Sequence, residues 1–128
     1  EAMASCQGRG LTLCTLEQWQ LACAGTEKRA YPYGKKWQEK SCSSASIAGF
    51  PEKLAPTGSA VSCKSPEGVM DLVGNAGEWV QGAWAVGGDV STMAKEASCW
   101  AKGKPPSGYR GALLGFRCCG TRNLVDSP

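Results

Sequence analysis

The stretch VMDLVGNAGEWV, residues 69–80, decides how this chain is expected to fold. It places two carboxylates, Asp71 and Glu78, among apolar side chains. The residues that allow the backbone to curl between them are Gly74, Asn75 and Gly77. Two acidic side chains around a tight loop can surround one hard cation, with backbone carbonyls as further ligands. The alternative, which the residues alone favour, is that Asp71 caps a turn and Glu78 lies at a rim.

The composition around this stretch fits one compact extracytoplasmic domain. The chain has 128 residues, 42% of them hydrophobic, with 17 Gly and 7 Pro, which indicates a real core and much loop. A net charge of +3 favours neither nucleic-acid binding nor adsorption to an anionic membrane. No apolar run is long enough to span a bilayer. The chain has no histidine, which removes the commonest general base and metal ligand.

Eight cysteines predict a disulfide framework made in an oxidising compartment. They are Cys6, Cys14, Cys23, Cys42, Cys63, Cys99, Cys118 and Cys119. A zinc site is the alternative, but no C-x-x-C pair occurs and most gaps are long and irregular. We therefore expect a secreted, periplasmic or cell-surface protein.

Two short helices are predicted near the start of the chain. Residues 1–7 have the pattern of the last turns of a helix. Thr15 is a good N-cap with Gln18 three residues later, which is a capping box, and the helix should end near Gly25. Trp19 is expected to pack in the core.

The rest of the chain reads as loops closed by one strand. Residues 26–68 and 81–110 are irregular, whereas residues 113–119 have the pattern of a closing strand. In such a strand Cys118 and Cys119 face opposite ways. They should have different disulfide partners, because a bond between adjacent cysteines is strained.

Five blocks of the sequence together resemble a known family. The blocks are GLTLCTLEQW (10–19), YPYG (31–34), GVMDLVGNAGEWV (68–80), GGD (87–89) and GFR (115–117). In order and spacing they resemble domains of the formylglycine-generating-enzyme, or sulfatase-modifying-factor, family. The resemblance implies an α+β, C-type-lectin-like fold with little regular secondary structure, covering residues 1–120 and followed by a tail, 121–128. It also implies that the opening strands of the family domain lie upstream of Glu1 or come from a partner chain.

The resemblance favours calcium over the plainer interpretation of the two carboxylates. One calcium site of the family resembles the side chains of Asp71 and Glu78 with the carbonyls of Gly74 and Ala76. The other uses an Asn in the segment that resembles residues 43–46. No Asn or Asp stands there, so we expect that second site to be lost.

The resemblance also implies where catalytic cysteines should stand. The enzymes bind copper(I) with two nearby cysteines that follow the segment resembling GGD. Here residues 87–93 hold no cysteine, and Cys99 comes late and alone. Copper(I) needs two positioned thiolates, and Cys118 and Cys119 follow the closing block and point apart. We expect no copper and no oxidase activity.

The resemblance suggests staples for the surplus cysteines. C-type-lectin folds commonly tie a helix cysteine to the last strand. By this analogy the expected bonds are Cys6 or Cys14 to Cys118 or Cys119, Cys23 to Cys42, and Cys63 to Cys99.

The function expected from these observations is a non-catalytic recognition or adhesion module. It would bind a glycan or a protein through the loop region 81–113. The candidate contact residues are Trp84, Asp89, Trp100, Tyr109 and Arg110. For Trp100, packing on a disulfide beside Cys99 is an equal alternative. Two other functions remain open: a formylglycine-generating-type oxidase, and a structural domain that contacts other chains or domains of a larger surface protein.

Overall fold

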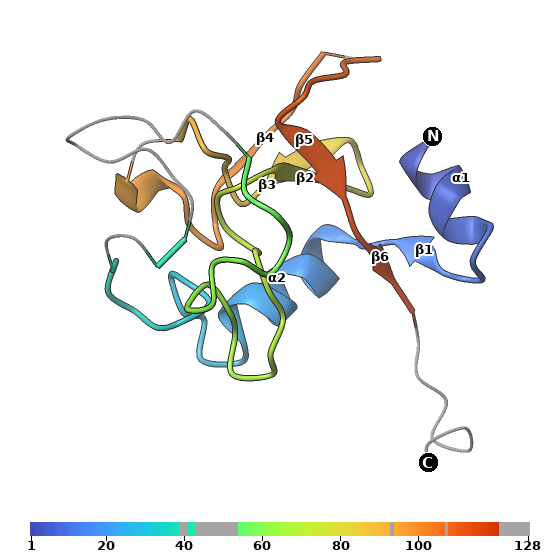
Figure 1. Cartoon of the computed structure of the whole chain (residues 1–128). Coiled ribbons are helices and arrows are strands. Elements are labelled where there is room, and N and C mark those ends of the chain that lie inside the picture. Colours follow the sequence, from blue (N-terminus) through green and yellow to red (C-terminus); the bar gives the residue numbers. More distant parts are fainter. Residues whose placement is uncertain (39–40, 43–53, 93, 107, 121–128) are drawn as a thin grey trace, which may run out of the picture.

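The computed structural model describes residues 1–38, 41–42, 54–92, 94–106 and 108–120. Within these ranges the protein is a small α+β structure with little regular secondary structure, as expected (Figure 1). The helices are α1 (Ala2–Gln7), α2 (Leu16–Ala24) and the 3-10 turn η1 (Ala94–Glu96). The strands are β1 (Thr12–Leu13), β2 (Gly77–Val80), β3 (Trp84–Val86), β4 (Lys102–Gly103), β5 (Leu114–Phe116) and β6 (Cys118–Cys119).

Both helices form where the sequence predicts them. At the start of α2 the Thr15 hydroxyl accepts a bond from the Gln18 amide at 3.0 Å. The Gln18 side chain in turn accepts from the Thr15 amide at 2.9 Å, which completes the capping box. Gly25 ends the helix with a φ of 67°, in the region that favours glycine. These signals are local, which is why the sequence locates the helix correctly.

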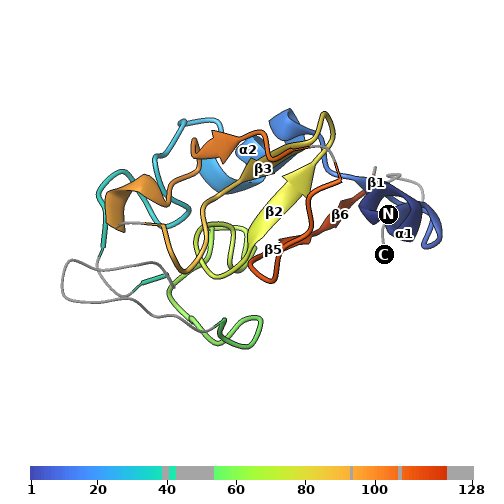
Figure 2. The ribbon, with the colours of Figure 1, turned by 90° about the horizontal axis from the view of Figure 1, so that it is seen from above.

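The larger sheet has the strand order β4-β3-β2-β5 (Figure 2). β2 and β3 form an antiparallel hairpin, whereas β2 and β5 are parallel and pair Trp79 with Phe116. β6 pairs instead with β1 in a separate two-stranded sheet. The single closing strand expected over residues 113–119 is therefore wrong in detail, because the chain changes sheet at Arg117.

The core joins α2 to the sheet. Trp19 is 1% exposed, which confirms its expected place, and Val80 and Val86 from the paired strands pack into the same cluster. The cluster also contains cysteines from three of the four disulfides. The core is thus crosslinked as well as packed, which suits a chain with so few strand and helix residues.

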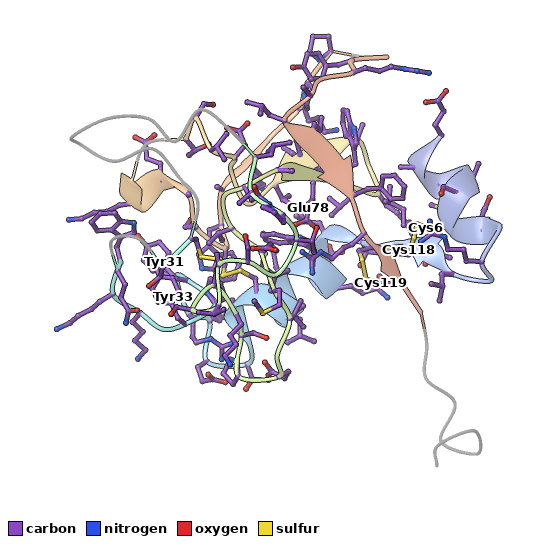
Figure 3. The ribbon with its side chains drawn as sticks, viewed as in Figure 1. Cys6, Tyr31, Tyr33, Glu78, Cys118 and Cys119 are labelled. Atoms are coloured by element: carbon purple, nitrogen blue, oxygen red, sulfur yellow. A yellow bond between two sulfur atoms is a disulfide. The ribbon has the colours of Figure 1, made fainter. Side chains whose placement is uncertain are left out.

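All eight cysteines form disulfides, some of which Figure 3 shows. The pairs are Cys6–Cys118, Cys14–Cys119, Cys23–Cys99 and Cys42–Cys63. The first two confirm that the adjacent cysteines of β6 take different partners from the N-terminal segment. The expected bonds from Cys23 to Cys42 and from Cys63 to Cys99 are wrong. The Cys99 amide donates to the Ala30 carbonyl at 2.8 Å, which brings Cys99 to the segment that follows α2 rather than to Cys63.

The stretch that opened the sequence analysis does curl between its carboxylates. Asp71, Gly74 and Asn75 all have positive φ, at 56°, 70° and 55°. Residues 31–34 form the expected turn, with backbone bonds in both directions between Tyr31 and Gly34. Among the described residues, no helix has the length and apolar character needed to cross a membrane.

Candidate functional site

Glu78 is a buried carboxylate with a complete set of partners. It lies on β2 and is 5% exposed. Its Oε1 accepts from Arg117 Nε at 2.5 Å and from Trp19 Nε1 at 3.3 Å. Its Oε2 accepts from Arg117 Nη2 at 3.0 Å. Figure 3 shows Glu78 at the centre of the molecule, between the sheet and α2. This two-point contact with a guanidinium is the strong geometry for a carboxylate.

Arg117 ties three segments together around that carboxylate. It stands between β5 and β6, and its Nη2 also donates to the Met70 carbonyl at 2.9 Å. The guanidinium therefore links the closing segment, β2 and the start of the loop after Met70. The side chain keeps 31% of its surface exposed, so one side of the ion pair is open to water.

The pKa of Glu78 reflects this surrounding. Burial raises the pKa of the carboxyl above its ordinary value of 4.5, because a buried negative charge loses its hydration. The guanidinium of Arg117 and the indole N–H of Trp19 act in the opposite direction by stabilising the charged form. The charge state of Glu78 thus depends on Arg117 staying in place.

Asp71 and Asn75 serve the neighbouring backbone. Asp71 Oδ2 accepts from the Gly58 amide at 2.7 Å. The Asn75 side chain exchanges two hydrogen bonds with the backbone of Ala55, at 2.8 and 3.1 Å. These contacts hold the segment before Cys63 against the curled loop. Asp71 and Asn75 also border a cavity of about 480 Å³. Its lining residues are Thr57, Met70, Asp71, Asn75, Ala76, Glu78, Gly115, Phe116 and Arg117.

This cavity is where a calcium ion would have to lie. Asp71, Ala76 and Glu78 border it, whereas Gly74 is not among its lining residues. Oxygen donors of this kind suit calcium. Both carboxylate oxygens of Glu78 are nevertheless engaged by Arg117, and no three Asp, Glu, His or Cys side chains of the described residues gather as a metal site. The donor set fits calcium only when the guanidinium leaves Glu78. The segment of the second expected site, residues 43–46, lies outside the described residues.

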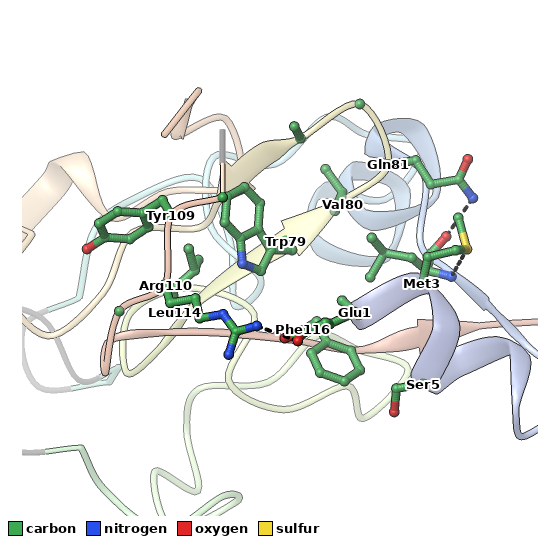
Figure 4. Close-up of a pocket in the computed structure, with 16 residues that line it drawn as sticks. Glu1, Met3, Ser5, Trp79, Val80, Gln81, Tyr109, Arg110, Leu114 and Phe116 are labelled. Atoms are coloured by element: carbon green, nitrogen blue, oxygen red, sulfur yellow. Dashed lines mark hydrogen bonds and ion pairs between the residues drawn. The ribbon is translucent and has the colours of Figure 1, made fainter. Parts of the chain in front are cut away.

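A larger groove opens on the other face of β2. It has a volume of about 760 Å³ and lies between α1, β2 and β5 (Figure 4). Trp79 and Phe116 lie side by side on its floor because the parallel register pairs them. An ion pair between Arg110 and Glu1 links its two walls. The lining residues are Glu1, Ala2, Met3, Ser5, Leu13, Trp79, Val80, Gln81, Gly82, Ala83, Gly108, Tyr109, Arg110, Gly111, Leu114 and Phe116.

The predicted contact residues do not form a single surface. Tyr109 and Arg110 line the groove, with Tyr109 48% exposed. Trp84 is not among its lining residues, although the preceding Gly82 and Ala83 are. The two remaining candidates, Asp89 and Trp100, lie outside the groove.

Asp89 and Trp100 have structural partners. Asp89 Oδ1 accepts from the amide and the hydroxyl of Ser91, at 2.8 and 2.5 Å, and so stabilises a tight turn. Trp100 donates from Nε1 to the Arg29 carbonyl at 3.1 Å while remaining 44% exposed. Neither residue lines the groove.

The groove contains residues that the sequence did not single out. Trp79, Leu114 and Phe116 line it together with the α1 residues Glu1 and Met3. The alternation around Phe116 was a visible signal, since it places that side chain away from Arg117. The contact with Trp79 had no local signal, because it arises from the parallel pairing of β2 with β5.

None of the eight thiols is free. Cys99, the cysteine nearest after residues 87–93, is bonded to Cys23 across α2, with 5.5 Å between the two Cα atoms. A disulfide sulfur is not a thiolate, and thiolates are what copper(I) requires. In this oxidised form the cysteines act as crosslinks.

Comparison with known proteins gives two matches for this chain. The family model for the sulfatase-modifying factor enzyme 1-like domain matches residues 1–122. The formylglycine-generating enzyme of Bos taurus is 31% identical over 96 residues, which cover 67% of this chain and 26% of that enzyme. The chain thus spans about a quarter of the length of this curated relative. The chain belongs to the sulfatase-modifying-factor (FGE-sulfatase) domain family.

Proposed function

We propose that this chain is a non-catalytic extracellular recognition domain with a C-type-lectin-like fold, which binds a glycan or protein ligand. The observation that carries the proposal is the groove between α1 and the β2–β5 edge. It presents Phe116, 40% exposed, and Tyr109, 48% exposed, on a scaffold held by four disulfides. Rigid aromatic side chains at a concave surface give large contact area at low entropic cost.

The pairing of the cysteines supports the absence of oxidase chemistry. The enzyme's reaction would need two thiolates, and every thiol of this chain is consumed by a crosslink. The same four disulfides support a location outside the cytoplasm, where such bonds form and persist.

Calcium is part of the proposal in a restricted form. The ion would take oxygen ligands from Asp71, Glu78 and the carbonyl of Ala76, with the Gly74 carbonyl as the fourth expected ligand. It would have to displace Arg117, whose guanidinium engages both Glu78 oxygens. Calcium and Arg117 therefore compete for one carboxylate. When bound, the ion supplies charge neutralisation to the curled loop and no step of a reaction.

The test of the recognition function is a ligand screen with paired variants. The intact chain is applied to a glycan array and to cell surfaces, next to a Tyr109→Ser/Phe116→Ser variant. The control is Leu21→Ser, since Leu21 is 57% exposed on α2 and does not line the groove. We expect a saturable ligand that the groove variant loses and the control keeps.

Other outcomes point to the alternative functions. Turnover of a cysteine peptide in the presence of copper(I) would overturn the proposal in favour of an oxidase. Equal binding by the groove variant and the control would move recognition away from the groove. No binding, together with failure of a longer parent protein to assemble without this domain, would favour a structural role.

A further inference from the structure

Trp84 lies beneath two lysine side chains. The Nζ atoms of Lys102 and Lys104 are each 4.7 Å from the centroid of its ring. These distances are those of cation–π interactions, in which the ring attracts the ammonium group. Lysine has a long flexible stem, so its charge is usually spread over many positions. Here the ring holds both charges at one place, which we call the lysine clamp (Trp84, Lys102 and Lys104).

The strand register builds the lysine clamp. β3 and β4 are antiparallel and pair Val86 with Lys102. Because side chains alternate along a strand, Trp84 shares a face with Val86, and Lys104 shares a face with Lys102. Diagonal neighbours on one face of a sheet are within reach of long side chains. The pairing of β3 with β4 thus brings both lysines near the ring.

The turn before β3 leaves the indole close to bare backbone. A Cβ atom added at Gly82, where φ is 88°, would lie 3.3 Å from Trp84 Cδ1. Because Gly82 has no side chain, nothing from this residue covers the edge of the Trp84 indole. Trp84 itself is half-buried and packs against the core cluster, so its position is fixed from beneath.

The charge of the lysine clamp is not balanced by its described neighbours. The two Nζ atoms are at most twice 4.7 Å apart, since both lie over one ring. Neither lysine forms an ion pair with a carboxylate of the described residues. An anion placed between the two ammonium groups would be attracted by both.

We propose that the lysine clamp binds the sulfate or carboxylate groups of an anionic glycan. This inference rests on the proposed recognition function and names its ligand class. Charges that the protein has already positioned gain most from a ligand whose own charges are fixed on rigid rings, because little freedom is lost on binding. The indole holds the two ammonium groups near one ring, so it contributes to the site by positioning charge.

Two other polyanions fit less well. An acidic peptide carries its charges on flexible side chains and has to order them on binding. Nucleic acids are usually bound by an extended basic surface, whereas the chain's net charge is only +3.

The test compares two lysine pairs with the same charge. The probes are a heparin-derived sulfated oligosaccharide, a carboxylate-only hyaluronan fragment and a neutral oligosaccharide of N-acetylglucosamine as the control. Affinity is measured by calorimetry. The variants are Lys102→Gln/Lys104→Gln and the control Lys35→Gln/Lys36→Gln, since Lys35 and Lys36 are also exposed. We expect the clamp variant to bind about tenfold more weakly, which corresponds to about 1.4 kcal/mol, and the control to change by less than about twofold. Lys102→Arg/Lys104→Arg should retain binding, because the charge and the ring contact remain.

The contradicting results are distinct. Equal losses in both double variants would show unspecific attraction to positive charge and overturn the clamp. Equal binding of a poly-glutamate peptide with the same number of charges would overturn the assignment of the ligand as a glycan. Failure of every anionic probe, with groove-dependent binding intact in the Tyr109→Ser/Phe116→Ser comparison, would remove the clamp alone and leave the recognition function standing.

Discussion

Glu78 and the lysine clamp lie on neighbouring strands of one sheet, yet their charges are balanced differently. Glu78 is buried on β2 and has its counter-charge inside the protein, in Arg117. Lys102 and Lys104 are exposed over Trp84 of β3, and none of the described carboxylates pairs with them. The ion pair of Glu78 with Arg117 therefore stabilises the fold. The positive charges of Lys102 and Lys104 are available to a negatively charged ligand.

The difference matters because it decides what each region can bind. At Glu78 the chain already supplies a cation of its own, so an external cation has to compete for the carboxylate. At the lysine clamp the chain supplies no described anion, so an external anion meets no competitor. Whether a charge already has a partner within the protein therefore distinguishes a structural site from a recognition site. The residue types alone do not make this distinction.

The largest expected effect is the loss of Arg117. Arg117→Met leaves Glu78 buried without its cation, and breaking a buried pair in this way costs several kcal/mol. Because Arg117 is 31% exposed, we expect about 3 kcal/mol, at the lower end of that range. Urea unfolding at neutral pH measures it. Lys102→Gln/Lys104→Gln is the matched comparison. It removes two exposed cation–π contacts and should cost about 1 kcal/mol, well below the loss in Arg117→Met. Similar losses in the two variants would erase the distinction between the regions.

The same Arg117→Met variant should respond to pH. Burial raises the pKa of Glu78, and the variant lacks the guanidinium that opposes this effect. The folded variant then binds the proton more tightly than the unfolded chain does. Its stability therefore falls as pH rises through the window between the ordinary pKa of 4.5 and the raised folded value. The deficit relative to wild type should be small at acid pH and complete above that window. A deficit that stays constant with pH would contradict the assignment to Glu78.

Calcium should produce the smallest change in the wild-type protein. An ion that binds only the folded state raises the melting temperature, but here calcium first has to displace Arg117 from Glu78. We expect a small rise in excess calcium relative to chelator, and a larger rise in Arg117→Met, where the carboxylate is available. Thermal unfolding by circular dichroism measures both, with Asp71→Asn/Glu78→Gln as the control that should lose the response. An identical rise in all three proteins would place calcium elsewhere.

Local features of the fold could be predicted from the sequence. The Thr15 capping box, the helix of residues 1–7 and the turn at Tyr31 depend on contacts within a few residues, and the structure has all three. The divergent partners of Cys118 and Cys119 followed from strand alternation and the strain of an adjacent bond.

Long-range contacts could not be predicted in the same way. The bonds Cys23–Cys99 and Cys42–Cys63 depend on how the irregular segments fold over α2, and spacing carries no information about that. The partnership of Glu78 with Arg117 depends on the chain changing sheet between β5 and β6. The groove was missed in part for the same reason, because parallel pairing of β2 and β5 creates its floor.

The most direct test of a recognition domain without oxidase chemistry is a thiol count joined to a turnover assay. The protein is denatured without reductant and titrated with a thiol reagent, and the folded protein is then incubated with copper(I), oxygen and a cysteine peptide. The four disulfides predict no reactive thiol and no aldehyde product. Two reactive thiols per chain, with copper-dependent conversion of the peptide, would contradict the account.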